Sequence, residues 1–158
     1  MYASLRPDSH QAEGRRFKLR TLALTVCPDG WSALSAGLDF TLRLWDLEAG
    51  ACTQKWQARG PISSIAVDPR GAWALLGGVR GVIWWDLESW DLRDSPGFWT
   101  HRGRVTAVAY AAPLGMVLGA SEDLAIYRWE LNTGSALEPL RGHRRTPSAL
   151  AVDRRGHI

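Results

Sequence analysis

A tryptophan followed by an acidic residue recurs at a nearly constant interval along this 158-residue chain. The pairs are Trp45-Asp46, Trp85-Asp86 and Trp129-Glu130, and their tryptophans stand 40 and 44 residues apart. A turn with a glycine precedes each pair and begins a fourth unit, with steps of 41, 44 and 41 residues between Gly30, Gly71, Gly115 and Gly156. Two markers with matching steps indicate an internal repeat, in which each unit buries its apolar face against its neighbours.

Each unit has the hydrophobic pattern of short strands rather than helices. Apolar residues alternate with others before the glycine turn, as in Leu22, Leu24 and Val26, and a period of two is typical of a strand. A second apolar run follows the turn, a third ends on the Trp-acid pair, and a more polar fourth run follows another turn. Four short strands in 40 to 44 residues predict an all-β fold of β-propeller blades, each a four-stranded antiparallel sheet.

Two segments resemble a known family. Residues 33–46 read ALSAGLDFTLRLWD, which is similar to the core of a WD repeat, and Arg141-Gly142-His143 resembles its Gly-His element. The resemblance to the WD-repeat (WD40) β-propeller family covers residues 17–158, as three full repeats and a partial fourth. It implies a buried hydrogen-bonded network in each blade, formed by a loop histidine, a serine or threonine, an aspartate in a bend and the tryptophan.

The resemblance assigns structural positions to Ser35, Asp39, Trp45, Asp46, Trp85, Asp86, His101, Asp123, Trp129, Gly142 and His143. The first unit lacks a well-placed histidine, and the third has Gly119 where the family has serine or threonine. The second unit has Val79 and Arg80 in its bend in place of the aspartate. We therefore expect no such network in the second unit.

The repeats divide the chain into blade 1 at residues 17–60, blade 2 at 61–103, blade 3 at 104–143 and the start of a fourth blade at 144–158. Residues 1–16 form an N-terminal segment, a candidate for the outer strand of a preceding blade, and residues 148–152 are predicted to be an innermost strand. Propellers close with about four to eight blades. We therefore expect an incomplete propeller, an open arc or a fragment of a larger chain, whose free edges allow self-association.

Composition favours a folded, soluble, cytoplasmic protein. The chain is 46% hydrophobic and 22% charged. It has no apolar run of about 18 residues that could span a membrane and no N-terminal signal-peptide pattern. Cys27 and Cys52 have no metal-binding spacing, and we expect free thiols rather than a disulfide.

The sequence contains no catalytic motif. It has no nucleophile elbow, zinc-protease helix or phosphate-binding loop, and its four histidines are too far apart for a local metal site. We therefore expect no enzyme activity, no metal and no cofactor.

The family resemblance implies one face that carries most partner contacts, where the bends between second and third strands meet the loops that lead into each blade. In this sequence the face would hold Leu38, Phe40, Arg59, Arg80, Phe98, Trp99, Arg102, Arg104, Glu122, Arg144 and Arg145. Arginine beside aromatic side chains is typical of a protein-binding surface, because guanidinium pairs with carboxylates in a bidentate way. We expect a protein partner with an acidic segment, although a solvated loop arginine explains any single residue equally well.

The leading functional interpretation is a non-catalytic scaffold or sensor module of WD-repeat type. One alternative is the propeller part of a larger signalling enzyme whose catalytic domain lies outside this chain. A weaker alternative is nucleic-acid binding through Arg15, Arg16, Lys18 and Arg20 together with the C-terminal arginine cluster. The net charge of +3 does not by itself indicate nucleic-acid binding. Of the nine tryptophans, Trp56, Trp90 and Trp99 are either partner contacts or packing residues at the rim.

Overall fold

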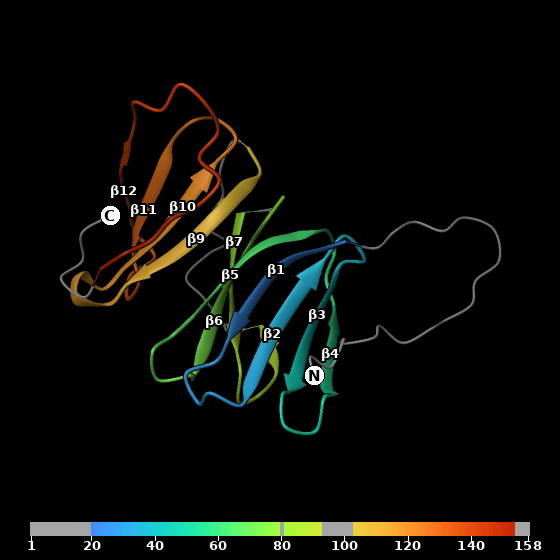
Figure 1. Ribbon diagram of the computed structural model, residues 1–158. Helices are drawn as coiled ribbons and strands as arrows, with labels where there is room; N and C mark the ends of the chain where they lie inside the picture. Colours follow the sequence, from blue (N-terminus) through green and yellow to red (C-terminus); the bar gives the residue numbers. More distant parts are fainter. Residues whose placement is uncertain (1–19, 80, 93–102, 154–158) are drawn as a thin grey trace, which may run out of the picture.

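The computed structural model describes residues 20–79, 81–92 and 103–153, which form three sheets (Figure 1). The strands of the first sheet are β1 (Thr21–Val26), β2 (Ser32–Gly37), β3 (Thr41–Asp46) and β4 (Ala51–Gln57). Those of the second sheet are β5 (Ile62–Val67), β6 (Trp73–Gly78), β7 (Gly81–Asp86) and β8 (Asp91–Leu92). The third sheet contains β9 (Val105–Ala111), β10 (Met116–Ser121), β11 (Ile126–Glu130) and β12 (Ala136–Leu140), with a 3-10 turn, η1 (Ala112–Leu114), after β9.

Each sheet is an antiparallel meander of four strands in chain order, and we call the sheets blades 1, 2 and 3. The tryptophan of each Trp-acid pair occupies the same place on the third strand. Trp45 lies opposite Ala33, and Trp85 lies opposite Ala74 in the same register. The predicted all-β fold of four-stranded antiparallel propeller blades is confirmed.

The repeated glycine follows from the geometry of the turn between the first and second strands. Gly30 and Gly71 have φ angles of 82° and 73°, in the left-handed region that side chains with a Cβ atom rarely adopt. Their backbone N–H groups close the turns by donating to the carbonyl oxygens of Cys27 and Asp68 at 3.0 and 2.8 Å. The spacing of these glycines therefore marks the recurrence of one turn.

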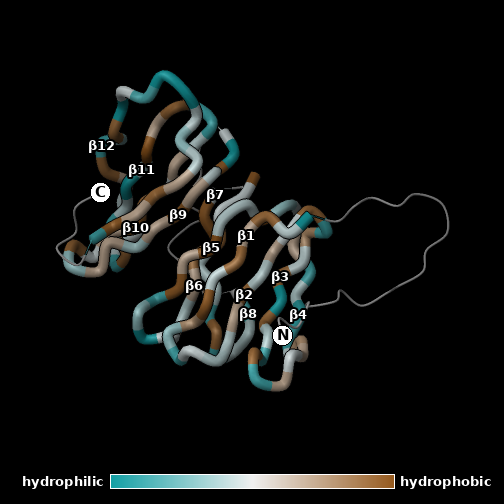
Figure 2. Tube along the Cα trace, viewed as in Figure 1, coloured by the Kyte–Doolittle hydropathy of each residue, from teal (hydrophilic) through white to brown (hydrophobic). Residues whose placement is uncertain are grey.

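The blades pack face to face, with the first strands β1, β5 and β9 as spatial neighbours (Figure 1). Leu34 and Leu42 of blade 1 pack with Ile62, Leu76 and Trp85 of blade 2. A second cluster joins blades 2 and 3 through Trp73, Leu75, Val82, Val105, Val108, Val117, Trp129 and Leu131. Figure 2 shows apolar residues in the strands and hydrophilic residues at many connecting turns. The core is therefore a series of interfaces between neighbouring repeats.

Side-chain hydroxyl groups satisfy backbone groups across these interfaces. Ser63 Oγ donates to the carbonyl oxygen of Val105, and Val108 N donates to Ser64 Oγ at 3.0 Å. Thr106 Oγ1 donates to the carbonyl oxygen of Pro147. Strands β5 and β9 are thus each tied to the segment that follows them around the arc.

The predicted innermost strand at residues 148–152 is wrong as a strand. A strand exists only through hydrogen bonds to a neighbouring strand, and no described residue pairs with this segment. Leu150 and Val152 nevertheless pack against the outer face of blade 3, where Ala109 and Leu118 lie. The predicted outer strand in residues 1–16 lies outside the described residues.

Candidate protein-binding face

The antiparallel meander brings the bends and loops of the predicted partner face to one end of each blade. The start of the first strand, the bend between the second and third strands, and the end of the fourth strand lie together. Leu38 N donates to the carbonyl oxygen of Arg20 at 3.0 Å, and Ala58 N donates to that of Phe40 at 2.7 Å. We call this surface the loop face, and it comprises residues 37–41, 57–62, 78–79, 103–105, 121–125 and 140–147.

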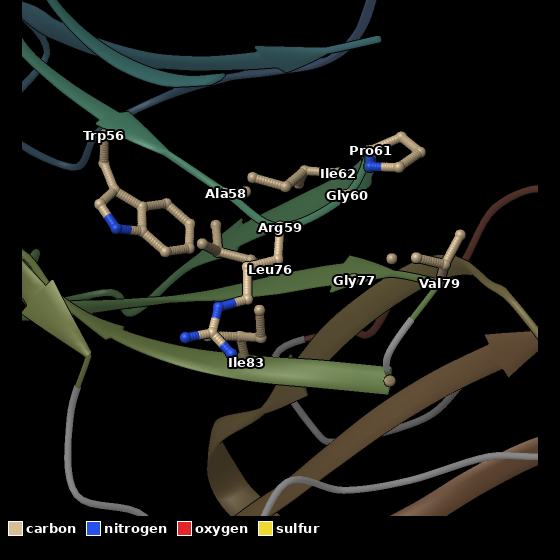
Figure 3. Close-up of a pocket in the computed structure, with 12 residues that line it drawn as sticks. Trp56, Ala58, Arg59, Gly60, Pro61, Ile62, Leu76, Gly77, Val79 and Ile83 are labelled. Carbon is tan, nitrogen blue, oxygen red and sulfur yellow. The ribbon is translucent and has the colours of Figure 1, made fainter. Parts of the chain in front are cut away.

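A pocket of about 240 Å³ opens on the loop face between blades 1 and 2 (Figure 3). It is lined by Trp56, Ala58, Arg59, Gly60, Pro61, Ile62, Leu76, Gly77, Gly78, Val79, Gly81 and Ile83. Arg59 carries the only charge among these described residues, and Figure 3 shows its side chain extending between Trp56 and Ile83. We call this site the interblade pocket.

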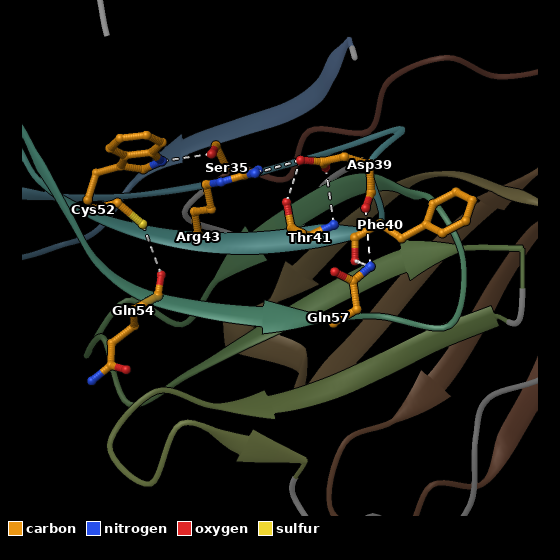
Figure 4. Close-up of polar contacts among 9 residues, drawn as sticks. Ser35, Asp39, Phe40, Thr41, Arg43, Cys52, Gln54 and Gln57 are labelled. Atoms are coloured by element: carbon orange, nitrogen blue, oxygen red, sulfur yellow. Dashed lines mark hydrogen bonds and ion pairs between the residues drawn. The ribbon is translucent and has the colours of Figure 1, made fainter. Parts of the chain in front are cut away.

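Blade 1 has a polar network at the equivalent end of its own sheet (Figure 4). Trp45 Nε1 donates to Ser35 Oγ at 2.7 Å. In the bend, Asp39 accepts from Thr41 Oγ1 at 2.7 Å and from Thr41 N at 3.1 Å, and it pairs with Arg43 at 2.6 Å. The predicted residues Ser35, Asp39 and Trp45 therefore belong to two bonded groups rather than one.

Thr41 and Arg43 are members of this network that sequence reasoning missed. Burial of Asp39 opposes its ionisation, but hydrogen bonds from Arg43 and Thr41 and the charge of Arg43 hold its pKa below the usual value. The available signal was position: Arg43 stands four residues after the bend aspartate and two before Trp45.

Blade 3 repeats this arrangement with a different residue. Tyr127 Oη donates to Asp123 Oδ2, and Ala125 N donates to Asp123 Oδ1 at 3.2 Å. Burial raises the pKa of Asp123, but these hydrogen bonds outweigh burial and lower it. Tyr127 stands two residues before Trp129, which is buried, and their rings stack at 5.9 Å. His101, the predicted histidine of this network, lies outside the described residues.

Blade 2 keeps the tryptophan without its acceptor. Trp85 is fully buried, and its Nε1 has no hydrogen-bond partner among the described residues. Leu76 occupies the register position on β6 that Ser35 occupies on β2. An apolar side chain thus replaces the hydroxyl group that Trp45 uses.

The bend of blade 2 also lacks the polar groups of its neighbours. Ile83 takes the place of Arg43 in the register, and Gly81 begins β7 where Thr41 begins β3. Val79 is exposed, and the placement of Arg80 lies outside the described residues. The interblade pocket is the space that these smaller and apolar residues leave open.

Two of the three tryptophans singled out as possible contacts pack within the blade 1–blade 2 interface. The ring centroid of Trp56 lies 4.3 Å from that of Trp85. The ring centroid of Trp90 lies 5.5 Å from that of Trp85, and the two rings pack edge to face. Trp56 is only half-buried because its ring also lines the interblade pocket. Trp99 lies outside the described residues.

The other predicted partner residues differ in their availability. Leu38 and Phe40 are 41% and 39% exposed, and Arg59, Arg144 and Arg145 are exposed on the same face. The guanidinium of Arg104 already pairs with the carboxylate of Glu122 at 3.0 Å. Arg80, Phe98, Trp99 and Arg102 lie outside the described residues.

The acidic residues that follow the tryptophans shape the turn at the other end of the blades. Asp46 Oδ1 accepts from Glu48 N and Ala49 N at 2.9 and 2.8 Å. Asp86 Oδ1 accepts from Glu88 N and Ser89 N, both at 2.9 Å. These aspartates hold tight turns and lie away from the loop face.

The structural role expected of His143 stays a prediction. Gly142 and His143 are exposed, and no hydrogen bond of the His143 side chain occurs within the described part of the chain.

The cysteines are free thiols, as expected. Burial and the nearby charge of Asp29 raise the pKa of Cys27 to about 11, whereas Cys52 is exposed. Within residues 20–79, 81–92 and 103–153, no group of three or more His, Cys, Asp or Glu side chains could hold a metal ion. In the same residues no helix is long and apolar enough to cross a membrane.

Comparison with curated proteins finds similarity to parts of longer chains. No protein-family model matches the chain. It is 21% identical over 139 residues to eukaryotic translation initiation factor 3 subunit I of Scheffersomyces stipitis, covering 77% of this chain and 39% of that protein. It is 39% identical over 67 residues to small ribosomal subunit protein RACK1y of Oryza sativa subsp. japonica, covering 42% and 20%. Over 60 residues it is 37% identical to a ribosome biogenesis protein BOP1 homolog of Chlamydomonas reinhardtii, covering 36% and 8%.

Solved structures share the fold. The chain superposes on the structures of U3-55K and of the RRP9 WD40 repeats with a TM-score of 0.75 and 22% identity in each case. The match covers 85% of this chain, but only 43% and 42% of those chains. The chain thus spans less than half the length of the proteins it matches. The curated relatives are WD40 proteins. The chain therefore has the fold of a WD40 β-propeller.

Proposed function

We propose that this chain is a non-catalytic protein-interaction module, a scaffold or sensor, that binds an acidic segment of a partner through the loop face. The observation that carries the proposal is the exposure of Leu38 and Phe40 next to the exposed Arg59 on one face. Apolar anchors supply buried area in a protein interface, and arginine supplies bidentate pairing to carboxylates. Rigid blades position such loops.

Three arginines are available for this pairing. Arg59, Arg144 and Arg145 are exposed and form no ion pair among the described residues. Arg104 contributes less, because Glu122 already neutralises its charge. An acidic partner therefore gains most from the first three residues.

The names of similar proteins agree with a role in assemblies. One relative is a subunit of translation initiation factor 3, and another, 25% identical over 103 residues, is target of rapamycin complex subunit LST8 of Saccharomyces cerevisiae. The free thiols Cys27 and Cys52 suit a reducing compartment, so we place the chain in the cytoplasm.

Charge reversal tests the proposed function. The probe is a fluorescein-labelled heptapeptide, Asp-Glu-Asp-Phe-Asp-Glu-Asp, and the measurement is its Kd by fluorescence anisotropy. We expect the triple variant R59E/R144E/R145E to bind about tenfold or more weakly, because like charges now face the peptide. The matched control is Arg70→Glu, which reverses an exposed arginine in the β5–β6 turn, away from the loop face. Equal affinity of the triple variant and the unaltered chain would refute the proposal.

Two competing functions predict different outcomes. Nucleic-acid binding through basic residues would show a steep fall of affinity for a labelled DNA or RNA oligonucleotide with rising salt. If the chain is the propeller part of a larger signalling enzyme, a longer reading frame upstream would encode the catalytic domain. Oligonucleotide affinity above that for the acidic peptide would favour the first of these alternatives.

A further inference from the structure

Two glycines at the rim of the interblade pocket lie close to neighbouring atoms, one of the backbone and one of a side chain. A Cβ atom at Gly78 would lie 2.5 Å from the carbonyl oxygen of Pro61, and one at Gly60 would lie 2.9 Å from Cγ2 of Val79. Glycine at these two positions lets the β4–β5 loop and the β6–β7 bend meet. The mouth of the pocket is therefore shaped by the backbone of Gly78 and Pro61 and by the side chain of Val79 against Gly60.

The walls of the pocket are equally preformed. Ile62 and Leu76 are buried in the cluster that joins blades 1 and 2. Trp56 is held by its contact with the buried ring of Trp85, 4.3 Å away. Folding of the blades already orders this apolar surface. Ligand binding therefore does not carry the free-energy cost of ordering these side chains.

The size of the pocket suits one side chain. An apolar cavity of about 150 Å³ accommodates benzene, and pockets for drug-sized ligands begin at about 300 Å³. The interblade pocket has about 240 Å³. It therefore fits an aromatic ring of the size of a phenylalanine side chain better than a whole cofactor.

The charge at the pocket favours an acidic neighbour of that ring. Arg59 is exposed, and it forms no ion pair within the described residues. It is also the only charged side chain in the described lining. A guanidinium beside the apolar walls of a pocket favours a ligand that presents a ring and a carboxylate together.

We infer that the interblade pocket binds the aromatic side chain of a partner peptide, with an adjacent carboxylate of that peptide paired to Arg59. This inference rests on the proposed protein-binding function and specifies the partner. The site exists because blade 2 has Leu76, Gly81 and Ile83 where blade 1 carries the polar network of its bend. Phe40, whose carbonyl oxygen accepts from Ala58 N, is 39% exposed on the same loop face.

Paired peptides and paired variants test the inference. Replacing the phenylalanine of the acidic heptapeptide by alanine is expected to weaken binding about tenfold, because the buried ring is lost. Ile83→Trp, which fills the pocket, is expected to have the same effect on the parent peptide and little effect on the alanine peptide. Arg59→Glu weakens both peptides, whereas the control Arg70→Glu changes neither. Urea unfolding of each variant verifies that the blades remain folded.

Nuclear magnetic resonance locates the ring independently. Titration of the nitrogen-15-labelled chain with 3-phenylpropionate, a ring joined to a carboxylate, is expected to shift the indole N–H signal of Trp56 and to leave that of Trp31 unmoved. Trp31 is exposed beside β2, away from the pocket.

The outcomes separate the two proposals. If the parent and alanine peptides bind equally and Ile83→Trp changes neither, while the triple arginine variant still loses binding, the pocket assignment is overturned and the protein-binding function stands. If no acidic peptide binds at all, both are overturned. The assignment is also overturned if 3-phenylpropionate leaves the indole N–H signal of Trp56 unmoved, because the ring then binds elsewhere.

Discussion

One position on the third strand differs in chemistry between the three blades. Two residues before the repeated tryptophan stand Arg43, Ile83 and Tyr127 in the three blades. Arg43 and Tyr127 bond to the bend aspartates Asp39 and Asp123. Ile83 instead lines the interblade pocket. Ile83 is therefore one of several changes, with Leu76, Val79 and Gly81, by which the blade 2 bend differs from the bends of its neighbours.

At the residue scale we predict that Asp39 contributes to stability in a pH-dependent way. Burial opposes ionisation of Asp39, but its bonds to Arg43 and Thr41 outweigh burial and depress its pKa. A carboxyl group with a depressed pKa stabilises the fold above its unfolded pKa of about 4, and this stability is lost as the pH falls through the folded pKa. We expect Asp39→Asn to cost about 1–2 kcal/mol of unfolding free energy at pH 7. Urea unfolding at neutral pH and near pH 3 measures this loss of unfolding free energy.

The contrast between the two pH values is the informative result. The deficit of Asp39→Asn should shrink in acid, because the unaltered chain then loses the same interaction. Glu138→Gln, which removes an exposed carboxylate on β12, serves as the control and should have little effect at either pH. A deficit that is equal at both values would contradict the role assigned to ionised Asp39.

At the scale of the element, the close approach of blades 2 and 3 depends on the lack of a side chain at Gly77. The register places Ala36 and Ala120 at the corresponding positions of the second strands in blades 1 and 3. A Cβ atom at Gly77 would lie 2.7 Å from Cγ1 of Val105 and 2.8 Å from Cγ1 of Val108. Strand β9 therefore packs more closely on β6 than an alanine would permit.

Gly77→Ala is expected to destabilise the fold by about 1–3 kcal/mol through overpacking. The measurement is the midpoint and slope of urea unfolding. Val105→Ala alone leaves a cavity, but in the double variant G77A/V105A the two changes should compensate in part, because one makes the space that the other needs. Strictly additive losses would show that the two side chains do not compete for space.

At the scale of the whole molecule, the two outward faces of the arc differ. Ile65 and Val67 of β5 pack on blade 1, and Leu150 and Val152 pack in the same manner on blade 3. The matching residues of β1 are uncovered, since Leu24 and Val26 are 64% and 58% exposed. Trp31 is exposed beside them. An apolar sheet face of this kind favours association.

We predict that the 158-residue chain self-associates through this β1 face. Sedimentation velocity over a range of concentrations should show species larger than a monomer, and L24K/V26K should shift the distribution toward the monomer because charges now lie on the face. Leu114→Lys, at another exposed apolar residue, is the matched control and should leave the distribution unchanged. A chain that is monomeric at all concentrations would contradict the prediction.

The repeat determined the strands, the blades and the positions of the tryptophans without reference to any structure. This was possible because periodicity is local: alternation reports which side of its own sheet a residue faces, and a recurring glycine reports a recurring turn. The absence of a bend aspartate in the second unit could also be read from Val79. Thr41, Arg43 and Tyr127 could not be assigned, because their roles depend on distances to Asp39 and Asp123.

Only the tertiary structure decided what lies between the blades. Trp56 and Ile83 belong to different sheets, and they line one pocket because blade 1 packs against blade 2 at a particular distance. The segment 148–152 is a second case in which the sequence pattern was not sufficient. It has the apolar alternation of a strand, but it has no hydrogen-bonding partner among the described residues. Periodicity describes one strand at a time, whereas pairing and pockets depend on where the next sheet lies.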